Sequence, residues 1–473
     1  MAMPTCAMDL HEAYQAALLQ DATTRAARAA VQASDERINQ AKAQRYPNVS
    51  LSAGYQRNNL DRTQPNFLGQ EVTVNDRYPS KNTTLTLRQP LYRKSIAVTV
   101  EQTLAQRDDV EAGLQKETQN LAVRVAEAYT QILFARDQLA FIEAQKTATS
   151  TQLDAARKQF AGGSGTRTDI DEAQARLDMA LALELEARQQ QGFAQRQLAL
   201  LINAPVELAA LRPLANDRLA AWIPPSAGVE DWLTQAETRS PELRQLRARL
   251  ETARLEVEKA RAGHLPTLDA VAQWSRSGSE NVTSPATRYL NRTMGVQLSV
   301  PLYAGGYVSA TVREAVARQT QAEELLEAVR RDLALRVTTE YRSVTEGRLR
   351  VRALEQAERS ADQLAQSSRK SMQAGVRTLV DVFNADQKKA QTQRDLARAR
   401  YEMLVAFVRL QALAGGVEAV EVVPAVLVGL AAGAFRGVEG VDAGHDQARA
   451  GDQGGGAGLG HAAEGAARRG AAH

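Results

Sequence analysis

The sequence predicts an α plus transmembrane β fold, in which long coiled-coil helices join strands that close into a barrel only when several copies assemble. Three observations predict it: an internal repeat, heptad spacing in the helical segments, and two pairs of alternating strand-like segments. The 473 residues contain only 5% aromatic and 24% charged side chains, and much of the apolar content is Ala and Leu. This composition is typical of long helices and coiled coils.

The repeat shows that the chain consists of two tandem structural repeats. Motifs in the first half recur about 210 residues later in the same order. The matched positions are Pro90–Tyr92 with Pro301–Tyr303, Gly163 with Gly375, and Asp169 with Asp381. We therefore expect each half to contain a helix, two strands, a very long helix, a tight turn and a further helix.

The predicted organisation has four parts. Residues 8–203 form the first structural repeat, 204–238 a linker or equatorial segment, and 239–416 the second structural repeat. The Pro-rich linker is expected to contain short structure of its own. Residues 417–473 form an Ala- and Gly-rich tail, for which two interpretations stay open: a disordered low-complexity segment, or the out-of-frame translation of a GC-rich gene.

The helical segments have the spacing of a supercoil. Helices are expected over residues 9–44, 96–160, 168–202, 241–263, 308–372 and 379–414. Apolar residues in the second of these alternate three and four apart, at Leu114, Leu121, Val125, Ala128, Ile132, Ala135, Leu139 and Ile142. A helix of roughly 65 residues spans on the order of 100 Å, so the two shorter helices of each half, stacked end to end, could match it.

Four strands are expected, over residues 47–57, 83–92, 266–277 and 288–302, each with one apolar and one small, polar face. This alternation fits either a core against water or lipid against a water-filled lumen. Two separated hairpins have no second layer to cover the apolar face, so closure by two, three or four copies into 8, 12 or 16 strands is expected. The predicted lipid-facing residues are Val49, Leu51, Leu85, Leu87, Val296 and Leu298, and residues 58–80 and 279–287 are predicted outward loops.

Several classes of function are not supported by the sequence. We find no phosphate-binding loop, zinc-protease helix or nucleophile elbow, so no catalytic, cofactor-binding or metal-binding residue is expected, and the protein is not predicted to be an enzyme. A single cysteine, Cys6, cannot form an internal disulfide. The net charge of +3 gives no support for a nucleic-acid partner. Before the tail, no apolar run is long enough to form a membrane-spanning helix.

Residues 8–416 resemble TolC-like outer-membrane efflux and type I secretion channels. The resemblance is carried by the two strand–loop–strand units, the Pro-Leu-Tyr exits into long helices, and the turn Gly375–Val382. It implies a homotrimer with a 12-stranded barrel in the Gram-negative outer membrane, continued by a long periplasmic α-barrel. It also implies an exit duct that carries protein or small-molecule substrates from an inner-membrane ABC or other pump and a periplasmic adaptor to the outside.

The resemblance also assigns candidate gate residues near the periplasmic mouth. The gate positions are Gln152, Asp169 and Arg377, and the position in an acidic ring at the constriction is Asp381. Met372 and Asn384 depart from the family pattern, because they stand where a linking tyrosine and a second acidic ring are found. Independently of the family, Asp169 and Asp381 fit the first turn of a helix, where a carboxylate is favoured by the helix dipole.

Two other classes of protein remain as alternatives. A periplasmic adaptor should have one helical hairpin inserted in a β-rich domain, and a coiled-coil scaffold should lack the alternating strands. The sequence leaves the cargo open between proteins and small molecules. We favour type I protein secretion, as in exporters of RTX toxins such as adenylate cyclase toxin.

Overall fold

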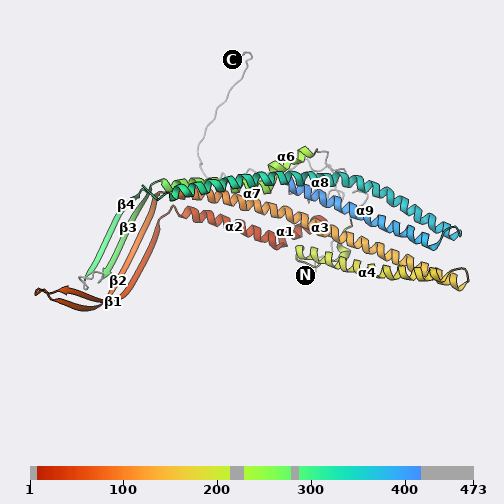
Figure 1. Cartoon of the computed structure of the whole chain (residues 1–473), viewed down its shortest axis with the longest axis horizontal. Coiled ribbons are helices and arrows are strands. Elements are labelled where there is room, and N and C mark those ends of the chain that lie inside the picture. The colour runs from red at the N-terminus through yellow and green to blue at the C-terminus, as the bar shows by residue number, and fades with distance from the viewer. Residues whose placement is uncertain (1–7, 214–227, 279–286, 417–473) are drawn as a thin grey trace, which may run out of the picture. The chain divides into compact units, whose positions relative to one another are not determined.

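The computed structural model describes residues 8–213, 228–278 and 287–416. Within this part of the chain, long helices lie alongside one another and lead into a four-stranded sheet (Figure 1). The predictions made for Cys6, for most of the loop 279–287 and for the tail 417–473 lie outside the described residues.

The helices agree closely with the expected ranges, with one exception. Their bounds are α1 Leu10–Gln20, α2 Ala22–Ala43, α3 Lys94–Ala161, α4 Arg167–Ile202, α6 Val229–Arg239, α7 Pro241–Arg261, α8 Tyr307–Gln373 and α9 Leu379–Leu413, with short 3-10 turns η1 Leu208–Ala210 and η2 Ala262–His264. The long helices α3 and α8 contain 68 and 67 residues. None of the helices in the described ranges combines the length and hydropathy that a membrane span requires.

The shorter helices pack along the two long ones. Helix α3 contacts α1, α2 and α4, whereas α8 contacts α7 and α9. Helix α3 also contacts α7 and α9, so the two repeats share one hydrophobic core. The predicted seam of α3 lies in it: Leu121, Val125 and Ile132 are fully buried. Because apolar residues at heptad spacing share one face of a helix, this packing follows directly from the sequence pattern.

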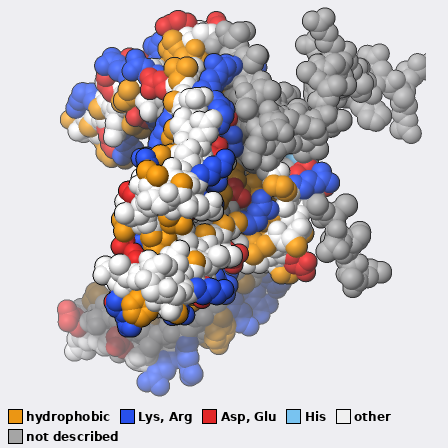
Figure 2. Space-filling model, turned by 90° about the vertical axis from the view of Figure 1, so that its right-hand side faces the viewer, with side chains coloured by type: hydrophobic (Ala, Val, Ile, Leu, Met, Phe, Trp, Pro, Cys, Tyr) orange, Lys and Arg blue, Asp and Glu red, His pale blue; other side chains and the backbone are white. Residues whose placement is uncertain are grey.

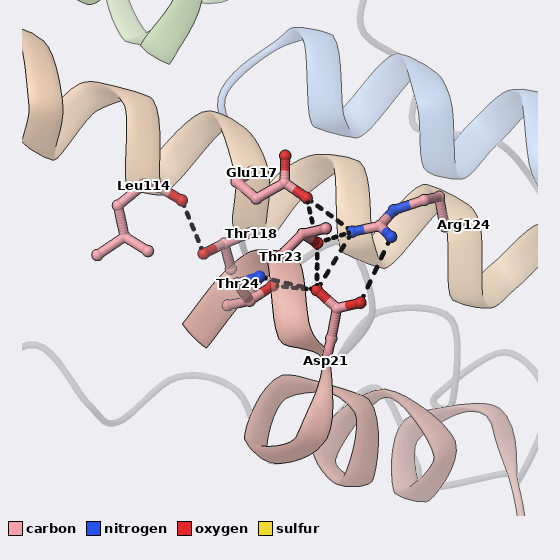
Figure 3. A network of polar contacts seen from close by, with 7 residues as sticks. All are labelled: Asp21, Thr23, Thr24, Leu114, Glu117, Thr118 and Arg124. Atoms are coloured by element: carbon pink, nitrogen blue, oxygen red, sulfur yellow. Dashed lines mark hydrogen bonds and ion pairs between the residues drawn. The ribbon is translucent and has the colours of Figure 1, made fainter. Parts of the chain in front are cut away.

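The predicted helix over residues 9–44 is wrong in one respect, because Asp21 divides it into α1 and α2. Asp21 has extended backbone and caps α2, accepting a hydrogen bond of 2.8 Å from the Thr24 amide. Its carboxylate also meets the hydroxyl of Thr23 and the guanidinium of Arg124 on α3 (Figure 3). A buried carboxylate needs such partners. Inside a continuous helix the backbone amides are already hydrogen-bonded, so Asp21 finds a free amide only at the start of a helix.

The strands differ from the prediction in length and in arrangement. Strands β1 (Asn48–Pro65) and β2 (Glu71–Tyr92) extend through most of the expected loop 58–80 and join at the short turn between them. Strands β3 (Thr267–Gly278) and β4 (Arg288–Ser299) form the second hairpin. The hairpins are not separate, because β2 pairs with β3 to give one antiparallel sheet in the order β1-β2-β3-β4.

Candidate functional site

One face of the sheet carries the predicted lipid-facing residues. Residues directly opposite in an antiparallel pair lie on the same face. The register places Val49 opposite Leu87, and Leu87 opposite Ala272. It brings all six predicted residues to one face: Val49, Leu51, Leu85, Leu87, Val296 and Leu298. In the single chain these apolar side chains are 37% to 69% exposed, so nothing in the described protomer covers them.

The two outer edges of the sheet are open. Among the described strands, β1 pairs only with β2 and β4 pairs only with β3. Open edges present a row of backbone donors and acceptors that invites pairing with another strand. The sheet of one protomer is therefore suited to continue into neighbouring sheets.

An ion cluster around one buried carboxylate ties the sheet to the helices. Asp269 on β3 is only 3% exposed at its side chain and pairs with Arg88 on β2, at 2.6 Å, and with Arg93, the residue that precedes α3, at 2.5 Å. Sequence analysis did not identify this cluster. The only signal for it was a lone carboxylate at a polar position of the third strand segment. Its geometry fixes where the first long helix leaves the sheet.

At the opposite end of the helices, both hairpins turn in the same way. Gly163 and Gly375 adopt φ values of +75° and +73°, a left-handed conformation that glycine adopts without strain. Each turn leads into a capping box in which a threonine and an aspartate exchange hydrogen bonds. In the second hairpin, the Thr378 amide donates to Asp381 Oδ2 at 3.0 Å and the Asp381 amide donates to Thr378 Oγ1 at 3.3 Å.

In these capping boxes, Asp169 and Asp381 stabilise the first turns of α4 and α9. Asp169 accepts a 3.0 Å hydrogen bond from the Thr166 amide, matching Asp381 in the other repeat. Hydrogen bonds from the amide and hydroxyl of Thr378, with a contribution from Arg377, lower the pKa of Asp381. Asp381 therefore remains negatively charged at neutral pH.

The predicted gate residues do not all meet within one protomer. Arg377 donates a 3.0 Å hydrogen bond to the buried Ser368 hydroxyl on α8. No hydrogen bond or ion pair joins Arg377 to Asp169 or Gln152 in the described part of the chain. Gln152 on α3 donates instead to Asp386 on α9, at 3.3 Å. A link from Arg377 to Asp169 would therefore have to join neighbouring copies.

Figure 2 looks onto the end of the molecule at which both hairpins turn. On this face Lys and Arg side chains are intermingled with Asp and Glu and with scattered hydrophobic ones. Sequence analysis missed several of the residues that hold the hairpins together near this end, namely Arg176, Phe383 and Asp386. The spacing of apolar residues along a helix predicts which face is buried, but it does not indicate which other helix these three residues contact.

The chain has the architecture of an outer-membrane transport channel, in which paired long helices continue into a sheet that is open at both edges. Comparison with known proteins supports this class. A family model described as "Outer membrane efflux protein" matches residues 13–204 and 232–416. The chain belongs to this family.

Relatives align along most of their length. The chain is 35% identical over 411 residues to the alkaline protease secretion protein AprF of Pseudomonas aeruginosa, which covers 86% of this chain and 85% of AprF. It is 30% identical to the proteases secretion protein PrtF of Dickeya chrysanthemi, covering 86% and 88%. It is 31% identical to the outer membrane protein TolC of Escherichia coli, covering 84% and 80%.

A solved structure of CusC shows the same fold, with a TM-score of 0.72, 19% identity, and coverage of 86% of this chain and 92% of the CusC chain. These findings confirm the predicted TolC-like resemblance, the channel fold, the outer-membrane location in Gram-negative bacteria and a transport role rather than an enzymatic one. The protein is an outer-membrane exit duct, and the family works with adaptor and inner-membrane pump components in tripartite systems.

Proposed function

We propose that three copies of this chain close into one duct that secretes proteins. The observation that carries the proposal is the four-stranded sheet, whose apolar face is uncovered and whose two edges are open. Three such sheets make a closed, even-numbered barrel of 12 strands, in which no edge remains. The six residues on its apolar face would then contact the lipid of the outer membrane.

Protein cargo is favoured over small molecules by the relatives. The two most similar relatives described above, AprF and PrtF, are both named for protease secretion. Each aligns with this chain over both repeats and through the turns at the hairpin ends. We therefore assign the chain to type I secretion, with a periplasmic adaptor and an inner-membrane ABC pump as partners. RTX-type proteins are the cargo class expected from the sequence.

The gate proposal follows from the hairpin ends. Arg377 of one copy would pair with Asp169 of the next, while Gln152 holds α3 against α9 inside the protomer. Three copies of Asp381 would form a negatively charged ring on the axis. Half-exposed ion pairs are worth only about 0.2–1 kcal/mol each. Three such pairs would favour the closed duct, yet a docking partner could still break them.

The test is deletion of the gene in its own bacterium. Mass spectrometry of the culture medium should show that one or a few secreted proteins disappear, while resistance to small toxic compounds is unchanged. Re-expression of the intact chain should restore them. An unchanged set of secreted proteins, combined with increased sensitivity to toxic compounds, would show that the duct carries small molecules instead.

A further inference from the structure

The sheet carries most of its cations on the face that bears the predicted lipid-facing residues. Strands β1 to β4 contain eight Lys and Arg residues. Side chains two apart along a strand lie on the same face, as do those directly opposite in an antiparallel pair. By this register, Arg62 and Arg88 lie on the polar face. The other six lie on the apolar face and are exposed: Arg57, Arg77, Lys81, Arg276, Arg288 and Arg292.

The two faces differ in how their cations are paired. On the polar face, Arg88 forms an ion pair with Asp269 at 2.6 Å, and Arg62 forms one with Asp76 at 3.6 Å. On the apolar face, none of the six cations forms an ion pair with a carboxylate of the described residues. Their positive charge is therefore not balanced by direct pairing in the described part of the protomer.

The side chains directly opposite these six cations are uncharged. Arg77 Nε donates a 3.2 Å hydrogen bond to Asn59 Oδ1, and Lys81 Nζ lies 5.9 Å from the centroid of the Tyr55 ring. The carboxylates on this face of the described strands are Asp61 and Glu71. Both lie nearer to the β1–β2 turn than any of the six cations, so the cations occupy a part of the face with charge of one sign.

The six cations lie beyond the apolar part of the face, on the side away from the helices. Strands β2 and β4 lead into the long helices α3 and α8, so the helices join the sheet at that end. Counted from the helix end, the residues of this face on β4 are Leu298, Val296, Met294, Arg292, Leu290 and Arg288. On β2, Leu87 and Leu85 likewise come before Lys81. Apolar side chains thus give way to cations with increasing distance from the helices.

Aromatic side chains indicate the level of these cations in a membrane. Tyr55 lies opposite Lys81, and Trp274 lies opposite Arg292, on the same face. Tyr and Trp are enriched where a membrane meets water, at the level of the lipid headgroups. In a closed barrel whose helices extend into the periplasm, the six cations would therefore lie at the headgroups of the outer leaflet.

We propose that these six cations, here called the basic band, bind the phosphate groups of lipopolysaccharide, the phosphorylated glycolipid of the outer leaflet. The proposal rests on the closed barrel of the proposed function, because only there does the apolar face contact lipid. Five of the six are arginines, whose guanidinium group can form two parallel hydrogen bonds to a phosphate. A cation at the edge of the hydrocarbon is costly without a partner, and an anionic headgroup supplies that partner.

The experiment measures lipid binding to the purified assembly in detergent by native mass spectrometry. The probe is diphosphoryl lipid A, the phosphorylated anchor of lipopolysaccharide. Two triple variants each remove the charges of one hairpin: Arg57→Gln/Arg77→Gln/Lys81→Gln and Arg276→Gln/Arg288→Gln/Arg292→Gln. Each cation near an anionic lipid surface strengthens binding by about fivefold, so each triple variant should bind the probe on the order of a hundredfold more weakly than the wild type.

The matched control is Arg62→Gln, which removes a cation from the polar face of the β1–β2 hairpin and should bind the probe as the wild type does. Lipid A without its phosphates should bind the wild type as weakly as the triple variants bind the intact probe. Inorganic phosphate alone should not distinguish the wild type from the variants. If it binds the wild type more tightly and displaces the probe, the site is one for free phosphate and the assignment to a glycolipid is wrong.

The wild type also provides a test that needs no substitution. Raising the salt concentration should weaken binding of diphosphoryl lipid A but not of zwitterionic phosphatidylethanolamine. Binding of lipid A that is independent of salt would overturn the proposal even if a variant failed to assemble.

The outcomes separate the basic band from the barrel on which it rests. A trimer that binds lipid A equally well in the wild type and both triple variants, or equally well with and without the phosphates, would overturn the basic band alone. A single-chain mass for the wild type would overturn the barrel and the basic band together.

Discussion

Asp21 shows how a single residue can end one helix and begin the next while tying both to α3. Burial alone would raise its pKa, but hydrogen bonds from Thr23 and Thr24, together with the positive charge of Arg124, lower its pKa to about 2. Because the folded pKa is depressed, the contribution of Asp21 to stability is complete above about pH 4 and is lost as the pH falls through about 2.

This argument predicts the effect of two substitutions. At neutral pH, Asp21→Asn should lower the unfolding free energy by about 1–2 kcal/mol because the charge is lost while a capping side chain remains. Asp21→Ala should cost about 1 kcal/mol more, since the cap is lost as well. Denaturant unfolding followed by circular dichroism measures both. Asp35→Asn, which removes a half-exposed partner of Arg107, is the control and should change little. Equal stability of the Asn variant and wild type at neutral pH would contradict the assigned role.

Asp381 gives a second pH-dependent prediction. If three copies line the axis, divalent cations added from the periplasmic side should block conduction, and Asp381→Ala should weaken that block. Hydrogen bonds from Thr378 lower the pKa of Asp381. The block should be lost as acid protonates these carboxylates, and the hydrogen bonds from Thr378 should move that loss to lower pH.

The control for this prediction is Asp171→Ala, which removes an exposed carboxylate near the start of α4. Thr378→Val removes one of the hydrogen bonds to Asp381 and should move the loss of block to higher pH. A block that is equally strong in the Asp381→Ala variant would place the constriction elsewhere. Because Asn384 stands where the family pattern has a second acidic ring, we expect the block to be weaker than in members with two.

Among the elements, the helices were the most predictable and the sheet the least. Heptad spacing predicted the buried seam of α3 because helix packing depends on which face is apolar. The polar stretch 58–80 was predicted to be a loop, yet most of it is strand. Both faces of this outer part of the hairpin are largely exposed in the protomer. Because neither face needs apolar side chains, the sequence lacks the alternation of apolar and polar residues that predicts a strand. The pairing of β2 with β3 joins segments nearly 200 residues apart. Local sequence patterns do not predict a pairing over that distance.

The candidate site was predictable only in part, for a similar reason. The capping aspartates Asp169 and Asp381 were found because their spacing from the turn glycines is local. The Asp269 cluster and the contacts of Arg176 and Asp386 depend on which helix or strand faces which. A sequence read one segment at a time contains no such information.

Strand orientation can be tested directly. Leu51→Arg places a charge on the apolar face, and near the middle of the bilayer it should cost roughly 2–4 kcal/mol of barrel stability. Ser52→Arg, the next residue of β1, places the same charge on the polar face and should be tolerated. The amount of heat-sensitive assembly in detergent extracts of outer membranes distinguishes the two. Normal assembly of Leu51→Arg together with loss of the Ser52→Arg assembly would reverse the assigned faces.

At the scale of the whole molecule, the protomer is incomplete by itself. Its sheet ends in two open edges and its apolar face is uncovered, although the helices of the same chain are tied together by an extensive shared core. Closure by neighbouring copies satisfies both requirements at once, because a closed barrel has no edge and lipid covers its apolar surface. Four strands per protomer permit closure with two, three or four copies, and the family resemblance favours three.

The mass of the assembly therefore tests the central claim most directly. Native mass spectrometry of the protein extracted from outer membranes in detergent should give three times the mass of one chain, which is 51.4 kDa for the full sequence. Heating in denaturant should reduce it to the single-chain mass. A single-chain mass before heating, or an assembly of two or four copies, would contradict a duct built from three four-stranded sheets.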